Sequence, residues 1–132
     1  MIRMSRKAVV LALAAGIAVP VLAAPSATAS SGGGSRVEAS GTCTGGGHWT
    51  LRAKADDGAL EVEYEVDTNV VGQAWKTVVT DNGTTIYRAT RTTRAPSGSF
   101  EAEVRTANRA GKDVIRATAT RNGRTCSGSV TF

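Results

Sequence analysis

The single histidine, His48, is the first residue whose type could do chemistry. The hairpin numbering described below places it opposite Asp67 and near Glu65. A metal site needs three or four converging ligands, and only these three side chains are local. A Ser-His-Asp triad would also need a serine beside an oxyanion hole, and the chain has no G-x-S-x-G turn. We therefore expect His48 to be a solvent-facing strand residue, with no metal and no catalytic role.

A row of three glutamates, Glu61, Glu63 and Glu65, is the next candidate, because paired carboxylates can hydrolyse glycosides. That reaction needs two carboxyl groups across a cleft, whereas these three project in a row from one strand, beside Arg52 and Lys54. We expect a solvated charged face, and a hydrolase using Glu61, Glu63 or Asp67 remains a rival hypothesis. We expect no cofactor.

Two short segments have acidic residues before a glycine, as calcium-binding loops do: Asp56-Asp57-Gly58 and Asp81-Asn82-Gly83. Both lack the remaining ligands of the twelve-residue calcium pattern. We interpret them as turns, and we expect no metal site in this chain.

Trp75 and Tyr87 are the aromatic residues whose environment the sequence leaves open. An exposed aromatic ring on a β-sandwich could stack on a sugar, so both are candidate ligand-binding residues. Burial is the interpretation that we prefer for them. Trp49, Tyr64 and Phe100 lie on apolar strand faces and are expected in the core.

The polar stretch from Arg91 to Gly98 contains the dipeptide Arg94-Ala95, which a trypsin-like protease could recognise. The stretch is therefore a candidate inhibitor loop acting through Arg94 and Ala95. Inhibitor loops need rigid support, and a connecting loop explains the same residues. We prefer the connecting loop.

The elements that must position these residues are β-hairpins, since the pattern of the chain has period two throughout. Asp57-Gly58 is suited to a type I′ turn, which pairs residues whose numbers sum to 115. The apolar and charged sets then separate: Trp49, Leu51 and Ala53 face Val66, Tyr64 and Val62, while Arg52 and Lys54 face Glu63 and Glu61. A slip of one residue would destroy both matches, so this register is well specified.

Two further Asn-Gly dipeptides predict two more hairpins. Asn122-Gly123 pairs residues that sum to 245 and places Cys126 on the apolar side. Asn82-Gly83 joins residues 75–80 to 85–90, but its faces are less clear, because the adjacent Val78 and Val79 cannot share a face.

With strands at residues 36–43 and 99–106, the chain has about seven to eight short strands. We predict an all-β, antiparallel sandwich of immunoglobulin-like or fibronectin III-like architecture, without antibody topology.

The N-terminal stretch resembles a targeting segment and is excluded from the fold. Basic residues precede an apolar run over residues 8–22, and Ala27-Thr28-Ala29 supplies the small residues that a signal peptidase needs. We predict a Sec-type signal peptide over residues 1–29, with Ala23-Ala24 as an alternative cleavage site. A flexible Gly/Ser leader over 30–35 and a single domain over 36–132 follow. Export favours a disulfide between Cys43 and Cys126.

Charge is distributed unevenly along the predicted exported chain. Residues 30–87 contain four basic and eight acidic residues, and residues 88–132 contain nine basic and three acidic residues. Such asymmetry could attract an acidic partner. Because a sandwich interleaves its halves in space, we prefer the alternative of mixed solvated faces. The basic half lacks interleaved aromatic residues, so we expect no nucleic-acid partner.

Four segments carry a resemblance to a known family: residues 41–50 (GTCTGGGHWT), 70–75 (VVGQAW), 95–100 (APSGSF) and 126–128 (CSG). With them the domain resembles a family of small secreted actinobacterial proteins of unknown function. The resemblance implies secretion and a β fold, and nothing about activity.

These observations favour a secreted, extracellular, non-enzymatic binding domain whose partner is cell wall, glycan or another extracellular protein. The alternative is a secreted serine protease inhibitor acting through Arg94-Ala95. We expect no membrane span and a monomer.

Overall fold

The computed structural model describes residues 35–132, so the predicted signal peptide and residues 30–34 of the leader lie outside the described residues. The described part contains strands and no helix. Its eight strands are β1 (Arg36–Thr42), β2 (His48–Asp56), β3 (Ala59–Asp67), β4 (Ala74–Asp81), β5 (Thr84–Thr92), β6 (Ser99–Ala107), β7 (Val114–Arg121) and β8 (Arg124–Thr131).

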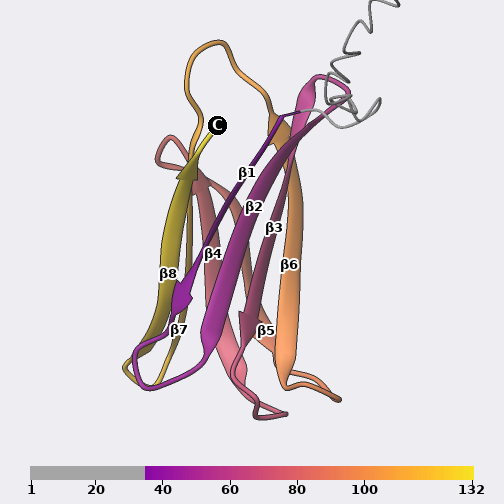
Figure 1. Ribbon diagram of the computed structural model, residues 1–132. Helices are drawn as coiled ribbons and strands as arrows, with labels where there is room; N and C mark the ends of the chain where they lie inside the picture. Colours follow the sequence, from indigo (N-terminus) through magenta and orange to yellow (C-terminus); the bar gives the residue numbers. More distant parts are fainter. Residues whose placement is uncertain (1–34) are drawn as a thin grey trace, which may run out of the picture.

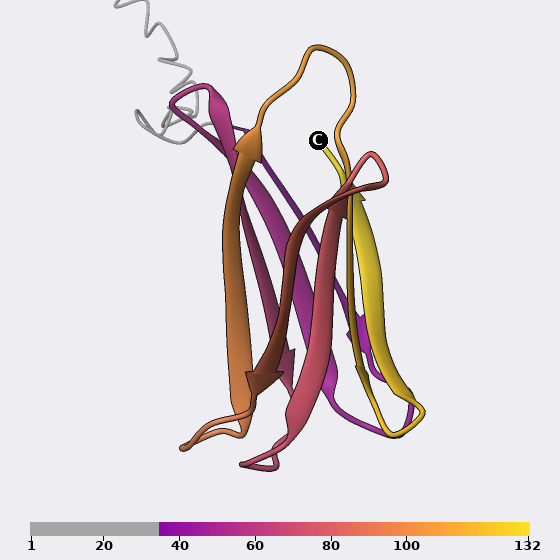
Figure 2. The same cartoon turned by 180° about the vertical axis from the view of Figure 1, so that it is seen from behind.

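The strands form two antiparallel sheets that lie face to face (Figures 1 and 2). The first sheet has the order β1-β2-β3-β6 and the second has the order β5-β4-β7-β8. The predicted all-β antiparallel sandwich is confirmed. In an immunoglobulin constant domain the second and third strands lie in opposite sheets, whereas β2 and β3 are neighbours here. The immunoglobulin-like part of the prediction is therefore not confirmed.

Two hairpins have the register that their turn dipeptides predict. Trp49 pairs with Val66 across β2 and β3, and Ile115 pairs with Val130 across β7 and β8. Asp57 and Asn122, the first residues of the two turns, have φ angles of 47° and 45°. A positive φ at this position is what a type I′ turn requires.

The third hairpin contains an irregularity that turn chemistry alone does not predict. Between β4 and β5 the register shifts at Val79 and Thr80. Val79 is fully buried and Val78 is only partly buried, so the adjacent valines lie on opposite faces. The shift lets β4 keep Val79 in the core while the turn at Asn82-Gly83 retains its own geometry.

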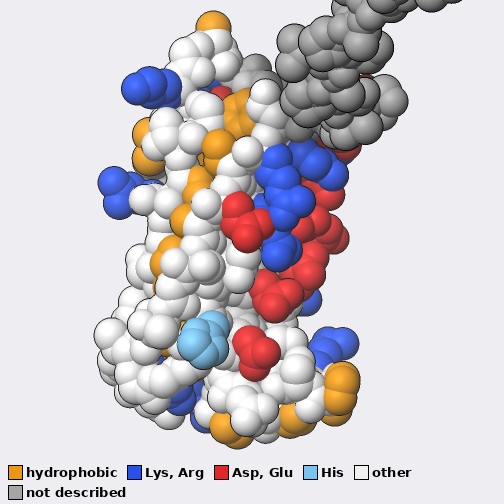
Figure 3. All heavy atoms as spheres, in the orientation of Figure 1, with side chains coloured by type: hydrophobic (Ala, Val, Ile, Leu, Met, Phe, Trp, Pro, Cys, Tyr) orange, Lys and Arg blue, Asp and Glu red, His pale blue; other side chains and the backbone are white. Residues whose placement is uncertain are grey.

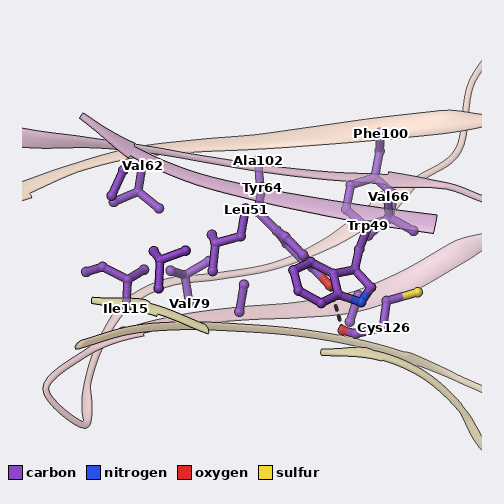
Figure 4. Close-up of a cluster of buried hydrophobic side chains, with 14 of the residues drawn as sticks. Trp49, Leu51, Val62, Tyr64, Val66, Val79, Phe100, Ala102, Ile115 and Cys126 are labelled. Carbon is purple, nitrogen blue, oxygen red and sulfur yellow. Dashed lines mark hydrogen bonds between the residues drawn. The ribbon is translucent and has the colours of Figure 1, made fainter. Parts of the chain in front are cut away.

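Apolar side chains from both sheets fill the space between them (Figure 4). Leu51, Val62 and Val66 from the first sheet and Val79 and Ile115 from the second are fully buried. The alternation of buried and outward residues along each strand accounts for this core. Every outward residue of the two sheets is thus left for solvent or for a partner.

Trp49 shapes one end of the core. Its indole covers the backbone of Gly41 in β1 and of Gly128 in β8, and a Cβ atom at Gly128 would lie 2.6 Å or less from three ring carbons. Nearby, the Tyr64 hydroxyl donates a 2.6 Å hydrogen bond to the Cys126 carbonyl (Figure 4). Burial raises the pKa of the Tyr64 hydroxyl well above its ordinary value, so it remains a donor.

The predicted disulfide is confirmed: Cys43 and Cys126 are bonded across a sequence separation of 83 residues. Cys43 follows β1 and Cys126 lies in β8, so the bridge joins the edges of the two sheets where β1 approaches β8. It closes nearly the whole domain into one loop.

Two carboxyl groups, from Asp81 at the end of β4 and Asp113 before β7, are fully buried. The Thr106 hydroxyl donates to Asp81 at 3.3 Å, and the Arg109 amide donates to Asp113 at 3.3 Å. One oxygen of each carboxyl group has no hydrogen-bond partner. Desolvation, and then the negative charge of Asp113, raises the pKa of Asp81. The pair therefore favours the protonated form of Asp81.

Candidate binding surface

His48 lies at the start of β2, exposed, and pairs with Asp67 of β3 as the hairpin numbering predicts. Within residues 35–132, the group of side chains that could hold a metal ion consists of Glu61, Glu63 and Glu103, and His48 is not part of it. The structure thus brings His48 to its predicted neighbour without assembling ligands around it.

The glutamate row lies on the outer face of the first sheet, among basic side chains. Arg52 contacts Glu38 at 2.8 Å and Glu63 at 3.6 Å, and Lys54 contacts Glu61 at 3.8 Å. In Figure 3 acidic and basic side chains gather in one band, on the side of the molecule where Figure 1 places the first sheet. This arrangement matches the solvated charged face that we expect from the sequence.

The pKa values of two carboxyl groups on this face are shifted in opposite directions. Hydrogen bonds from Arg52 and then Arg36 hold the pKa of Glu38 below its ordinary value. Desolvation, followed by the charges of Glu103, Glu63 and Glu65, raises the pKa of Glu101. The hollows beside the row are small, about 100 Å³ and 280 Å³. They lie on an open sheet face, where glycoside hydrolysis would need a substrate-enclosing cleft.

Trp75, a candidate ligand-binding residue, is fully buried, which is the environment that we prefer for it from the sequence. The Arg124 guanidinium lies 5.5 Å from the centroid of the indole ring and donates a 2.6 Å hydrogen bond to the Gly46 carbonyl. No face of the ring is left for a sugar. Tyr87 is partly buried and packs against the core, so the candidate stacking pair does not form a surface platform.

The Arg94-Ala95 loop is a tight connection between β5 and β6. The Arg94 amide donates to the Ser99 carbonyl at 2.9 Å, and the Arg94 carbonyl accepts from the Gly98 amide at 2.8 Å. An inhibitor would have to place this carbonyl in the oxyanion hole of its protease, where it accepts hydrogen bonds from the enzyme. Because the carbonyl is already engaged within its own turn, the geometry favours a connecting loop.

The neighbouring β3–β4 loop exposes Val70 and Val71, with 49% and 54% of their surface accessible. Two buried threonines brace it: Thr93 donates to the Val70 carbonyl at 2.6 Å, and Thr68 donates to the same oxygen at 3.3 Å. The loop is well supported, but two valines form a small apolar surface.

The two sheets differ in charge, which corrects our preference for mixed faces. Strands β1, β2, β3 and β6 carry four basic and eight acidic residues, whereas β4, β5, β7 and β8 carry six basic residues and one acidic residue. That one, Asp81, is buried. The reason is the pairing of β3 with β6, which brings two acidic strands from different parts of the chain into one sheet.

We call the outer surface of the second sheet the basic face. Its outward positions alternate with core positions along each strand and carry ten hydroxyl side chains, three cations and three apolar side chains. They are Ala74, Lys76, Val78, Thr80, Thr85, Arg88, Thr90, Thr92, Val114, Arg116, Thr118, Thr120, Thr125, Ser127, Ser129 and Thr131. Figure 2 has this sheet toward the viewer.

The basic face is hollowed along β4. A groove of about 440 Å³ lies between β5 and β7, with Lys76 and Arg88 at its side and Thr90, Thr118 and Thr120 among its lining. The five ion pairs found in residues 35–132 all lie on the first sheet. Lys76, Arg88 and Arg116 therefore face outward without an acidic side chain to neutralise them.

Sequence patterns alone did not reveal this surface. A signal was present: every second residue from Lys76 to Thr80, from Arg88 to Thr92 and from Arg116 to Thr120 is basic or hydroxylated, apart from Val78, and none is acidic. The signal becomes meaningful only when the three strands are known to be neighbours with these positions on one face.

Comparisons of the chain with protein-family models, curated proteins and solved structures found no match. Residues 35–132 contain no helix that could span a membrane.

Proposed function

We propose that this protein is an exported, non-enzymatic binding domain that attaches to an anionic polymer of the cell wall or cell surface. Its basic face is the binding surface. The observation that carries the proposal is a hollowed sheet face with three cations, ten hydroxyl side chains and no acidic side chain. The predicted signal peptide and the Cys43–Cys126 disulfide support a location outside the cell.

The proposed binding rests on the attraction between the cations of the basic face and an anionic ligand. Lys76, Arg88 and Arg116 have no acidic neighbour on the basic face, so an anionic ligand would give them the counter-charge that the first sheet gives its own cations. Threonine and serine hydroxyls between them can donate to the same anion. Opposite charge also accelerates encounter with a polymer.

Co-sedimentation with insoluble cell wall tests this proposal. Residues 30–132, which contain both sheets and the disulfide, are mixed with cell wall, chitin and cellulose at low and high salt. We expect retention on cell wall at low salt. If three cations each neutralise one negative charge of the polymer, affinity falls about 100- to 500-fold for a tenfold rise in salt. Chitin and cellulose are uncharged and should retain little protein.

A matched pair of variants separates local binding from net charge. Replacing Lys76, Arg88 and Arg116 by Gln removes three positive charges from the basic face and should abolish retention. Replacing Arg36, Lys54 and Arg105 by Gln removes three charges from the first sheet, and retention should remain. Equal retention of the two variants, or retention on neutral glycans that survives high salt, contradicts the proposal.

A further inference from the structure

The hollow of the basic face continues beyond its first part. A second hollow of about 350 Å³ lies next to the groove and shares Lys76, Thr90 and Thr120 with it. It extends along β4 to Ala74 and to the turn at Asn122-Gly123. The two hollows form one open channel that follows β4, rather than a closed pocket for one small molecule.

The channel is long enough for more than one unit of a chain. Ala74 and Val78, which line its two parts, are four residues apart on β4, or about 13 Å along an extended strand. The channel is open to solvent on the sheet surface, so a polymer could enter at one end and leave at the other. This shape favours a linear ligand over a branched or compact one.

Lys76 and Arg88 line this channel, and Arg116 lies beyond its Val78 end. Arg88 pairs with Val78, one outward position along β4 from Lys76, which places the two cations about 8 Å apart at the backbone. Arg116 pairs with Thr80, one outward position further on. Arg121 lies at the other end, where its guanidinium donates to the Ala74 carbonyl at 3.2 Å. Separated single cations suit a ligand with one negative charge per repeat.

The side chains on this surface further restrict the class of ligand. The outward positions of β4, β5, β7 and β8 carry no aromatic residue, and Trp75 is buried beneath them. Sugar rings and nucleic-acid bases are commonly held by stacking on aromatic side chains. Lysine, arginine and threonine instead match the oxygens of an anionic group such as a phosphate.

We infer that the basic face binds an unbranched polymer of acyclic polyol units joined by phosphodiester bonds, lying along β4 with its phosphates on Lys76, Arg88 and Arg116. The inference rests on the proposed function and names its ligand class. Threonine hydroxyls of β5 and β7 donate to phosphate or polyol oxygens, and Val78 contacts the carbon chain between phosphates.

The test is a binding titration of residues 30–132 with soluble probes at one fixed low salt concentration. The probes are glycerol phosphate, poly(glycerol phosphate) of increasing length, polygalacturonate, and a single-stranded oligonucleotide matched in charge. We expect affinity for poly(glycerol phosphate) to rise with length until the channel is spanned and then to level off. Polygalacturonate and the oligonucleotide should bind at least tenfold more weakly.

Two variants complete the test. Lys76→Gln with Arg88→Gln should lower affinity for poly(glycerol phosphate) at least tenfold, whereas the control Lys54→Gln with Arg36→Gln should leave it unchanged. Equal binding of polygalacturonate or oligonucleotide overturns the phosphodiester inference, and so does equal binding of single glycerol phosphate. In those cases retention on cell wall that depends on the basic face still upholds the proposed function. Failure to bind any polyanion or cell wall refutes both.

Discussion

Gly128 is the position at which a single methyl group should do most harm to the fold. A Cβ atom there would lie 2.6 Å from Cζ2 of Trp49 and closer still to Cη2 and Cζ3. Carbon atoms pack at about 3.5–4.0 Å, so the indole would have to move by an ångström or more. It has little room, because the same ring also covers Gly41, where a Cβ would lie 2.8 Å from Cζ2.

We therefore expect Gly128→Ala to cost about 3 kcal/mol of unfolding free energy, at the upper end of ordinary overpacking. For a domain of this size that corresponds to a fall in Tm of about 12–24 °C. Urea and thermal unfolding followed by circular dichroism, with the disulfide intact, would measure both quantities.

A double-mutant cycle identifies the cause of the loss. In a Trp49→Phe background the smaller ring leaves space for the methyl group, so Gly128→Ala should cost less than half as much as in the wild type. If the two substitutions are additive, the contact between Trp49 and residue 128 is not what limits the stability, and the packing argument fails.

Two further predictions concern the disulfide and the buried acids. Replacing Cys43 and Cys126 by Ala should cost about 4 kcal/mol, because the unfolded chain loses a closure of 83 residues, and unchanged urea unfolding would contradict this. Asp81 has a raised pKa in the folded state, so the stability that its proton contributes is present in acid and is lost as the pH rises through that pKa. Wild-type Tm should thus fall as the pH rises above the ordinary carboxyl pKa, whereas Asp81→Asn, still facing Asp113, should flatten this profile; an identical profile would refute the assignment.

The sequence was sufficient to predict the hairpins, whose geometry depends on residues that are close together along the chain. Two hairpin registers followed from Asp57-Gly58 and Asn122-Gly123, because each turn fixes which residues face each other. The disulfide followed from the predicted export and from the presence of just two cysteines in the sequence. The shift at Val79 and Thr80 did not follow, since the turn and the core impose different registers on one hairpin.

The candidate surface depended on pairings between distant strands, which local patterns do not specify. The contact of β3 with β6 and that of β4 with β7 decide which charges share a sheet. Dividing the chain into an acidic and a basic half placed Lys76 with the acids and Glu101 and Glu103 with the bases. In the structure Lys76 belongs to the basic second sheet, and Glu101 and Glu103 belong to the acidic first sheet. This pairing of strands is what leaves the outer face of the second sheet without acidic residues.

The central claim is that the basic face is the surface that binds, and a residue-resolved footprint tests it most directly. Amide NMR spectra of residues 30–132 would be recorded during titration with soluble cell-wall polymer fragments at low salt. We predict that the shifted amides cluster on the outward positions of β4, β5 and β7, around Lys76, Arg88 and Thr118. Shifts centred on the glutamate row of the first sheet, or on Val70 and Val71, would contradict the account.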